Sequence, residues 1–220
     1  MKKLIVLALA AASIVPAQAQ KWNFGVEAGY VHNTLAVEEF TATARSGFKA
    51  GAIAELMLAE NVSFESGLAF IRKGATISLV DVGYGYSHIH SIKFKEMNYL
   101  QIPLMVGYNF KLGNHFSIKP EVGGYYAVGV GGHALVSGTN TLGFPYEGRV
   151  ETFSGSDIVS PETPPYRPSH RNDGGLAFAL NVNYRHFGVK AEYDLGLATT
   201  TFNGNGKQRT LSVSLVYRIF

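Results

Sequence analysis

Beyond residue 20, apolar and polar residues alternate along most of the chain with a period of two. The last run is the clearest, because Leu211, Val213, Leu215 and Tyr217 fall on one face and mainly polar residues fall on the other. Successive side chains of a β-strand point to opposite faces, so this alternation predicts strands and not helices. Eight stretches show it: residues 22–32, 47–58, 62–79, 92–110, 115–136, 171–185, 187–199 and a final one that ends at Phe220.

The connections between these stretches alternate in length. Short turns follow the second, fourth and sixth stretches, and longer segments follow the others. An even number of strands with short turns at one end and long loops at the other is typical of outer-membrane proteins. We therefore predict an all-β fold, an eight-stranded antiparallel up-and-down transmembrane β-barrel of the smallest outer-membrane size. The expected long loops are residues 33–46, 80–91, 137–170 and 200–206, of which the proline-rich third is expected to be extended and extracellular.

The first 19 residues have the features of a secretory signal peptide. Two lysines near the start are followed by a short apolar stretch and by the sequence AQA at residues 17–19, which predicts cleavage after Ala19. Residues 20–220 are then expected to form one barrel domain in the bacterial outer membrane. The chain has no cysteine, which excludes disulfides and thiolate chemistry. No apolar run after the signal reaches the ~18 residues that a membrane helix needs.

The face of the strands opposite the apolar row carries charged residues of both signs. A lysine or arginine that faced lipid at mid-depth would cost about 2–4 kcal/mol. We therefore predict that these residues point into the barrel and pair with one another, which would fill the interior and leave no open pore. The alternative is a soluble, lipocalin-type barrel with this face outside. The residues are Glu27, Glu55, Glu65, Glu121, Glu192 and Asp194 with Lys49, Lys73, Lys119, Arg185, Lys190 and Arg218.

Aromatic residues favour the membrane interpretation, because many of them fall at the short-turn ends of the predicted strands. Such a belt is expected where a membrane meets water. Arg72, Lys207 and Arg209 fall at the opposite, extracellular ends, where long basic side chains can reach the phosphates of lipopolysaccharide. The predicted belt consists of Trp22, Tyr108, Phe110, Phe116, Tyr184, Phe187, Tyr217 and Phe220.

Four segments give the chain a family resemblance. They are GFKAG at residues 47–51, FESGL at 64–68 with Lys73-Gly74 following, YLQIPL at 99–104 and RNDGG at 171–175. With these segments the chain resembles PorT-like outer-membrane β-barrel proteins of Bacteroidetes-type bacteria. The resemblance implies an eight-stranded barrel inserted by the barrel-assembly machinery. The name-giving member is tied to a protein secretion system, a role that we do not transfer. In the usual insertion signal the terminal aromatic residue shares the apolar face, whereas Phe220 here is out of phase with Tyr217.

Candidate chemistry in the sequence is sparse. His88 and His90 share a strand face but have no evident third metal ligand. Ser66 has lipid-facing parity, but no histidine is paired with it by sequence, and a hydrolytic triad is defined by geometry.

We predict a non-catalytic barrel without cofactors whose loops contact lipid, lipopolysaccharide or an unknown extracellular or periplasmic protein. A lipid A-modifying hydrolase and a secretion-system accessory barrel are the alternatives. Without the two lysines of the signal the formal net charge falls from +3 to +1, so no nucleic-acid partner is expected.

Overall fold

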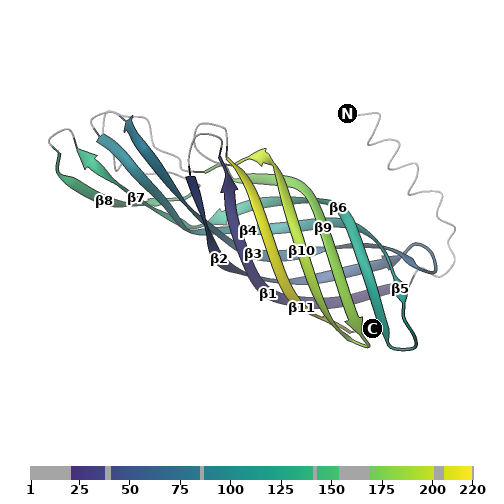
Figure 1. Ribbon diagram of the computed structural model, residues 1–220. Helices are drawn as coiled ribbons and strands as arrows, with labels where there is room; N and C mark the ends of the chain where they lie inside the picture. Colours follow the sequence, from purple (N-terminus) through teal and green to yellow (C-terminus); the bar gives the residue numbers. More distant parts are fainter. Residues whose placement is uncertain are drawn as a thin grey trace, which may run out of the picture.

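The computed structural model describes residues 21–37, 41–84, 87–140, 143–153, 169–200 and 206–219 (Figure 1). The predicted signal peptide and the terminal Phe220 lie outside these residues. So does the segment 154–168, which contains four of the five prolines of the predicted long loop. Among the described residues, no helix is long and apolar enough to cross a membrane.

Eight strands form a closed antiparallel barrel. The sheet closes because the last strand pairs with the first, from Gly25↔Arg218 to Ala36↔Lys207, and because β4 pairs with β6. This confirms the predicted fold. The barrel strands are β1 (Trp22–Ala36), β2 (Thr41–Met57), β3 (Val62–Tyr84), β4 (Ser87–Tyr108), β6 (Phe116–Gly131), β9 (Asn172–Tyr184), β10 (Phe187–Thr199) and β11 (Lys207–Arg218).

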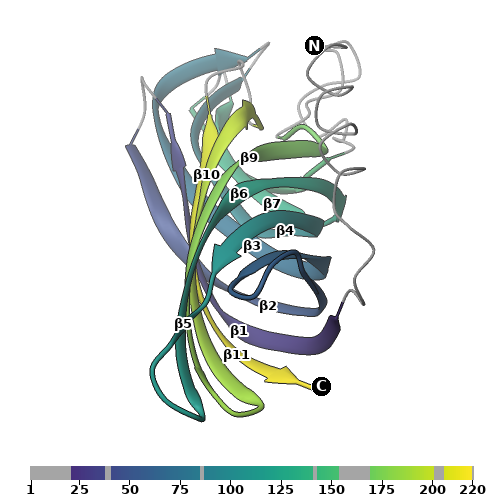
Figure 2. The ribbon, with the colours of Figure 1, turned by 90° about the vertical axis from the view of Figure 1, so that its right-hand side faces the viewer.

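The predicted alternation is visible in the burial of the strands. Along β11, Leu211, Val213 and Leu215 are exposed on the outer face, whereas Ser212 and Ser214 are buried. The other strands repeat this pattern, so the apolar row covers the outside of the barrel. Figure 2 shows how the strands tilt around the barrel axis. The short turns lie where the sequence predicts them, at residues 58–61, 112–115 and 185–186.

Two predicted loops, 33–46 and 80–91, are in fact mostly β-structure, and predicted loop 137–170 is so in part. In the first of them, β1 continues to Ala36 and β2 begins at Thr41. Strands β3 and β4 continue through the predicted loop 80–91 up to residues 84 and 87, with backbone register pairs such as Val82↔Ile89. Residues 137–151 also belong mainly to strands, because β7 (His133–Asn140) pairs with β4 and β8 (Pro145–Glu151) pairs with β7. A further strand, β5 (Phe110–Lys111), extends the line of β4 beside β6. The ends of β3 and β4 with β7 and β8 project beyond the barrel in Figure 1, and we call this part the extension.

The extension reverses the polarity of the barrel. Inside it, Ile77, Ile92, Phe94 and Val136 are buried in an apolar cluster, and lysines of β4 are exposed. On β4 the reversal follows from a bulge: Lys73 pairs with Met97, but Ala75 pairs with Phe94, so two residues of β4 lie opposite one residue of β3. Because of this additional residue, the side of β4 that faces inward in the extension is the side that faces outward in the barrel.

Gly132 connects the barrel to the extension. Its φ is +148°, a conformation that favours glycine, and a Cβ at this position would overlap the carbonyl oxygen of Glu96. We expect Gly132→Ala to destabilise the attachment of β7 and β8 by about 1–3 kcal/mol, measured as faster amide hydrogen exchange in β7 and β8. Gly131→Ala is the matched control, because a Cβ there meets no atom within 4 Å. Equal exchange in the two variants would contradict the assignment of Gly132 as a required joint.

Candidate functional site

One carboxylate of the barrel interior, that of Glu65, has more cations around it than any other among the described residues. Glu65 of β3 is 0% exposed, and three cations from three other strands approach it. Lys119 Nζ of β6 lies 2.8 Å from Glu65 Oε2, and Lys190 Nζ of β10 lies 2.9 Å from Glu65 Oε1. Arg218 Nη2 of β11 is 3.5 Å from Glu65 Oε2. This carboxylate therefore links strands from opposite sides of the barrel.

The pairing continues from this centre towards the short-turn end. Lys119 Nζ lies 2.6 Å from Glu55 Oε1 and 2.8 Å from Glu121 Oε1. Glu55 also accepts a hydrogen bond of 2.7 Å from the Ser63 hydroxyl, and Glu121 accepts one from the Asn181 amide. Buried ionic groups are tolerated when their remaining hydrogen-bonding positions are satisfied in this way.

Towards the other end, a second set of pairs joins β1, β2 and β10. Lys190 Nζ lies 2.9 Å from Glu192 Oε2, and Lys49 Nζ lies 2.8 Å from Glu192 Oε1. Lys49 Nζ is also 3.0 Å from Glu27 Oε1. Glu192 therefore connects this set to the central one through a shared lysine.

The interior pairs reach the base of the extension at Lys73. Its ammonium lies 3.0 Å from Asp173 Oδ2 and sits over the rings of Tyr99 and Tyr125 at 5.2 and 5.1 Å. Asp173 was not among the predicted interior residues, although it is buried and its parity in β9 is the same as that of the other inward positions. Nearby, Asp194 accepts a 3.0 Å hydrogen bond from Gln101 but has no cation within ion-pair distance among the described residues.

Arg185 is a correction to the predicted interior set. It occupies the turn between β9 and β10, has a φ of +54° and is exposed, with its guanidinium carbon 5.6 Å from the Tyr184 ring centre. Strand β9 ends one residue earlier than predicted, and the turn removes Arg185 from the inward row. The other eleven predicted interior residues are buried or, for Arg218, 12% exposed at the side chain.

The predicted aromatic residues that the structure describes are all exposed on the outer face. They contact one another in pairs, such as Tyr108 with Phe110 at 4.7 Å and Phe187 with Tyr217 at 5.2 Å between ring centres. A second group of exposed aromatic residues, which the sequence analysis did not select, lies nearer the extension: Tyr30, Phe48, Tyr126 and Tyr193.

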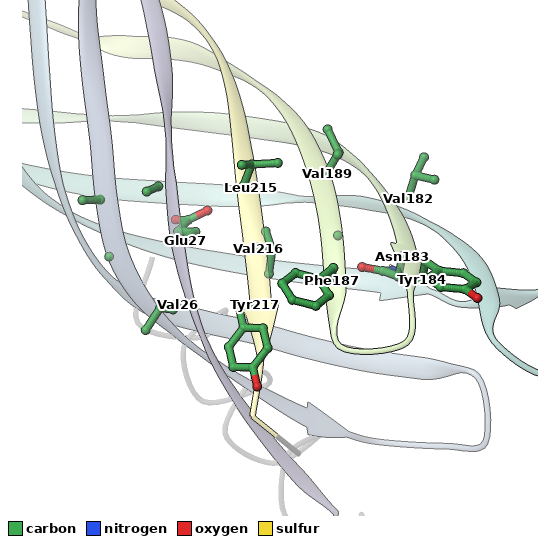
Figure 3. Close-up of a pocket in the computed structure, with 14 residues that line it drawn as sticks. Val26, Glu27, Val182, Asn183, Tyr184, Phe187, Val189, Leu215, Val216 and Tyr217 are labelled. Atoms are coloured by element: carbon green, nitrogen blue, oxygen red, sulfur yellow. The ribbon is translucent and has the colours of Figure 1, made fainter.

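The outer face also carries an apolar hollow of about 670 Å³ between β1, β2, β9, β10 and β11. Small side chains, including Ala28 and Ala50, line it together with larger ones such as Leu215. Figure 3 shows Phe187 and Tyr217 next to each other where β10 and β11 approach the short turns. Such an extended apolar exterior requires an apolar surrounding.

The three predicted lipopolysaccharide contacts lie at the end that carries the extension. Arg72 is partly exposed, donates a 3.0 Å hydrogen bond to Asn98 Oδ1 and lies 3.5 Å from Glu96 Oε1. Arg209 donates to the carbonyl oxygens of Gly196 and Gln208, and Lys207 is exposed.

The described residues supply no evident catalytic or metal centre. None of their histidines hydrogen-bonds a serine hydroxyl, and no group of three or more His, Cys, Asp or Glu among them is placed to hold a metal ion. His133 instead lies 3.1 Å from Glu151 Oε1 and 3.7 Å from Glu96 Oε2 at the base of the extension. The side chains of His88 and His90 lie outside the part that the structure describes.

A closed barrel with an apolar exterior, aromatic rings near its short turns and a polar interior defines an integral protein of bacterial outer membranes. The family model described as "Outer membrane protein beta-barrel domain" matches residues 17–201, and the chain belongs to this family. The predicted location in the outer membrane is confirmed. In the usual topology of such barrels the short turns are periplasmic and the longer connections extracellular, and we expect the same orientation for the short turns and the extension of this chain.

Several solved structures are similar to this chain. Ail, the attachment invasion locus protein of Yersinia pestis, is 13% identical, with 90% of this chain and 99% of that chain covered and a TM-score of 0.42. Neisserial surface protein A is also 13% identical, with 88% and 96% covered and a TM-score of 0.42. The N-terminal β-barrel domain of Pseudomonas aeruginosa OprF is 11% identical, with 87% and 97% covered and a TM-score of 0.31. The search of curated proteins gave no match.

Proposed function

We propose that this protein is a non-catalytic outer-membrane barrel whose interior is closed by ion pairs and whose extracellular end makes structural, lipid or partner contacts. The observation that carries the proposal is the connected set of interior ion pairs that runs from Arg218 through Glu65 and Lys190 to Lys49, with the separate Lys73–Asp173 pair beyond it. It involves strands all around the barrel, and an eight-stranded barrel is just wide enough for its interior to be filled by side chains. Such an interior leaves no path for a hydrated solute.

Conductance in planar bilayers tests the closed interior. We expect the purified protein to give no sustained conductance, under conditions in which a general porin inserted in the same bilayer conducts steadily. Protein insertion is verified separately by heat-modifiable migration of the reconstituted sample on gels. Steady conductance by the inserted barrel would contradict the proposal, because the ion pairs would then not close the interior.

The extension is the part of the molecule suited to partner contact. It is built on continuous β-structure from the barrel, and rigid scaffolds position binding segments more precisely than free loops do. Its outer side offers charged side chains of both signs, including Lys93, Lys95 and Glu147, all exposed. Arg72, Lys207 and Arg209 lie nearby at the membrane boundary, where lipopolysaccharide phosphates are within reach of basic side chains.

We further propose that the chain is PorT-like and of Bacteroidetes type, as the sequence resemblance implies. In support, each segment that carries the resemblance supplies a polar side chain to the interior. These side chains are Lys49, Glu65, Lys73, Gln101 and Asp173. Cleavage after Ala19 and insertion by the barrel-assembly machinery through the C-terminal strand belong to the same proposal. No observation favours the hydrolase or the secretion accessory.

A further inference from the structure

We propose that the periplasmic end of the barrel binds the phosphate-containing headgroup of an anionic phospholipid of the periplasmic leaflet. The inference rests on the exposed charges, hollows and rings at the short turns, and it does not depend on whether the barrel interior is closed.

The exposed side chains at this end are predominantly basic. Lys21, Lys111 and Arg185 are exposed there, and His115 and His186 lie in the turns between them. The exposed acid described at this end is Glu60, whose Oε1 lies 3.9 Å from Lys111 Nζ. At that distance and exposure the pair leaves the basic character of the end largely uncompensated.

Arg185 lies at the meeting point of three hollows. The first, of about 530 Å³, is lined by His115, Arg185, His186 and Arg218. The second, of about 440 Å³, includes Lys21 and Lys111, and the third, of about 140 Å³, leads towards the lower interior pairs. Arg185 lines all three. The basic groups therefore surround a space that can receive an anionic group.

The guanidinium of Arg185 has no ionic partner among the residues that the structure describes. Arg218, by contrast, directs its guanidinium inward to Glu55 and Glu65, with Nε 3.5 Å from Glu55 Oε2 and Nη2 3.5 Å from Glu65 Oε2. A planar guanidinium presents several hydrogen-bond donors in a geometry that matches phosphate oxygens. Arg185 is therefore the group best placed to hold an incoming phosphate.

The position of Arg185 relative to the aromatic residues favours a lipid over a soluble acidic peptide. Its guanidinium lies over Tyr184, whose ring is exposed on the lipid-facing side. His186 follows, with its ring centre 6.2 Å from that of Tyr217, and Phe187 comes next on the same outer face. Because aromatic rings of membrane proteins lie at headgroup level, the basic group faces the layer that contains lipid phosphates.

Native mass spectrometry of the purified protein in detergent tests the site, with phosphatidylglycerol as the probe. We expect Arg185→Asn to weaken phosphatidylglycerol retention about fivefold, which corresponds to ~1 kcal/mol for one basic residue at a membrane surface. Asparagine tolerates the positive φ of Arg185, so the turn should be preserved. Arg185→Lys should retain most of the binding, and Arg149→Gln, at an exposed position of the extension, should leave it unchanged.

Two further measurements test whether the bound group is a lipid phosphate. Diacylglycerol with the same acyl chains but no phosphate should be retained weakly and equally by the parent and Arg185→Asn. Equal phosphatidylglycerol retention by these two proteins would overturn the proposal, as would an equal loss in Arg149→Gln. Arg185-dependent sedimentation with peptidoglycan sacculi, without Arg185-dependent lipid retention, would assign the site to a periplasmic polymer and also overturn it. Heat-modifiable migration confirms that each variant is folded.

Discussion

Replacing Glu65 with glutamine is expected to destabilise the barrel by about 3–5 kcal/mol. Glu65 is fully buried and shared by Lys119, Lys190 and Arg218. The substitution preserves shape but removes the negative charge, so the cations around it retain a positive charge that is only partly compensated. Urea unfolding of the protein in lipid vesicles, followed by heat-modifiable migration, measures the loss.

Asp194→Asn is the matched control for this prediction. Asp194 is also buried in the interior, but its Oδ1 has no hydrogen-bond partner and its Oδ2 accepts from the neutral Gln101. The described interior contains seven buried carboxylates and five cations, so removing this charge lowers an excess of negative charge. We expect Asp194→Asn to be within about 1 kcal/mol of the parent protein, or more stable.

The comparison of the two variants is decisive for the ion-paired interior. If Glu65→Gln were as stable as Asp194→Asn, the contacts of Glu65 would contribute no more than those of an unpaired buried acid. The cations around Glu65 would then contribute nothing to the free energy of unfolding, and the interior would have to be stabilised by packing alone.

The barrel strands could be predicted from the sequence because each strand faces two different environments. Lipid outside and paired charges inside require opposite side chains at successive positions, as at Leu215 and Ser214 of β11. This requirement also predicted ten buried interior charges and Arg218. It did not identify Asp173, which lies near the start of β9, where the apolar row is interrupted by glycines.

The prediction failed where the environment changes. Beyond the bulge at Lys95 and Glu96, water replaces lipid outside, so β4 exposes Lys93 and buries Phe94. The alternation continues, but the apolar side chains now point inward. Because the sequence prediction kept apolar side chains on the outside throughout, it ended the third strand near residue 80. Arg185 was misplaced for a related reason, because parity applies only while the strand continues and β9 ends at Tyr184.

The exchange of faces locates the extracellular boundary of the membrane. On β4 the apolar outward row runs from Phe110 of the adjoining β5 to Leu100 and gives way to Asn98 and Glu96. Ten residue steps cover about 33 Å along a strand, or about 25 Å of membrane depth at the usual tilt, which matches the apolar band of such barrels. Two features lie at the extracellular edge of this band. They are the bulge that inverts β4 and the ion pair between Arg72 and Glu96.

Leu104→Arg is expected to destabilise the protein in lipid vesicles by about 2–4 kcal/mol, because Leu104 lies at the middle of this row. Phe110→Arg is the matched comparison. The two side chains are almost equally exposed, at 50% and 51%, but Phe110 lies at the periplasmic edge of the band. There the same charge reaches water and should cost about 0–1 kcal/mol.

The difference between these two variants distinguishes lipid from water on the outer face. If the outer face were in water, two equally exposed positions would accept arginine at similar and small cost. A large penalty at Leu104 with a small one at Phe110 follows only from an apolar layer centred near Leu104. Urea unfolding midpoints of both variants in the same vesicles decide the question, and equal midpoints would contradict an apolar layer centred near Leu104.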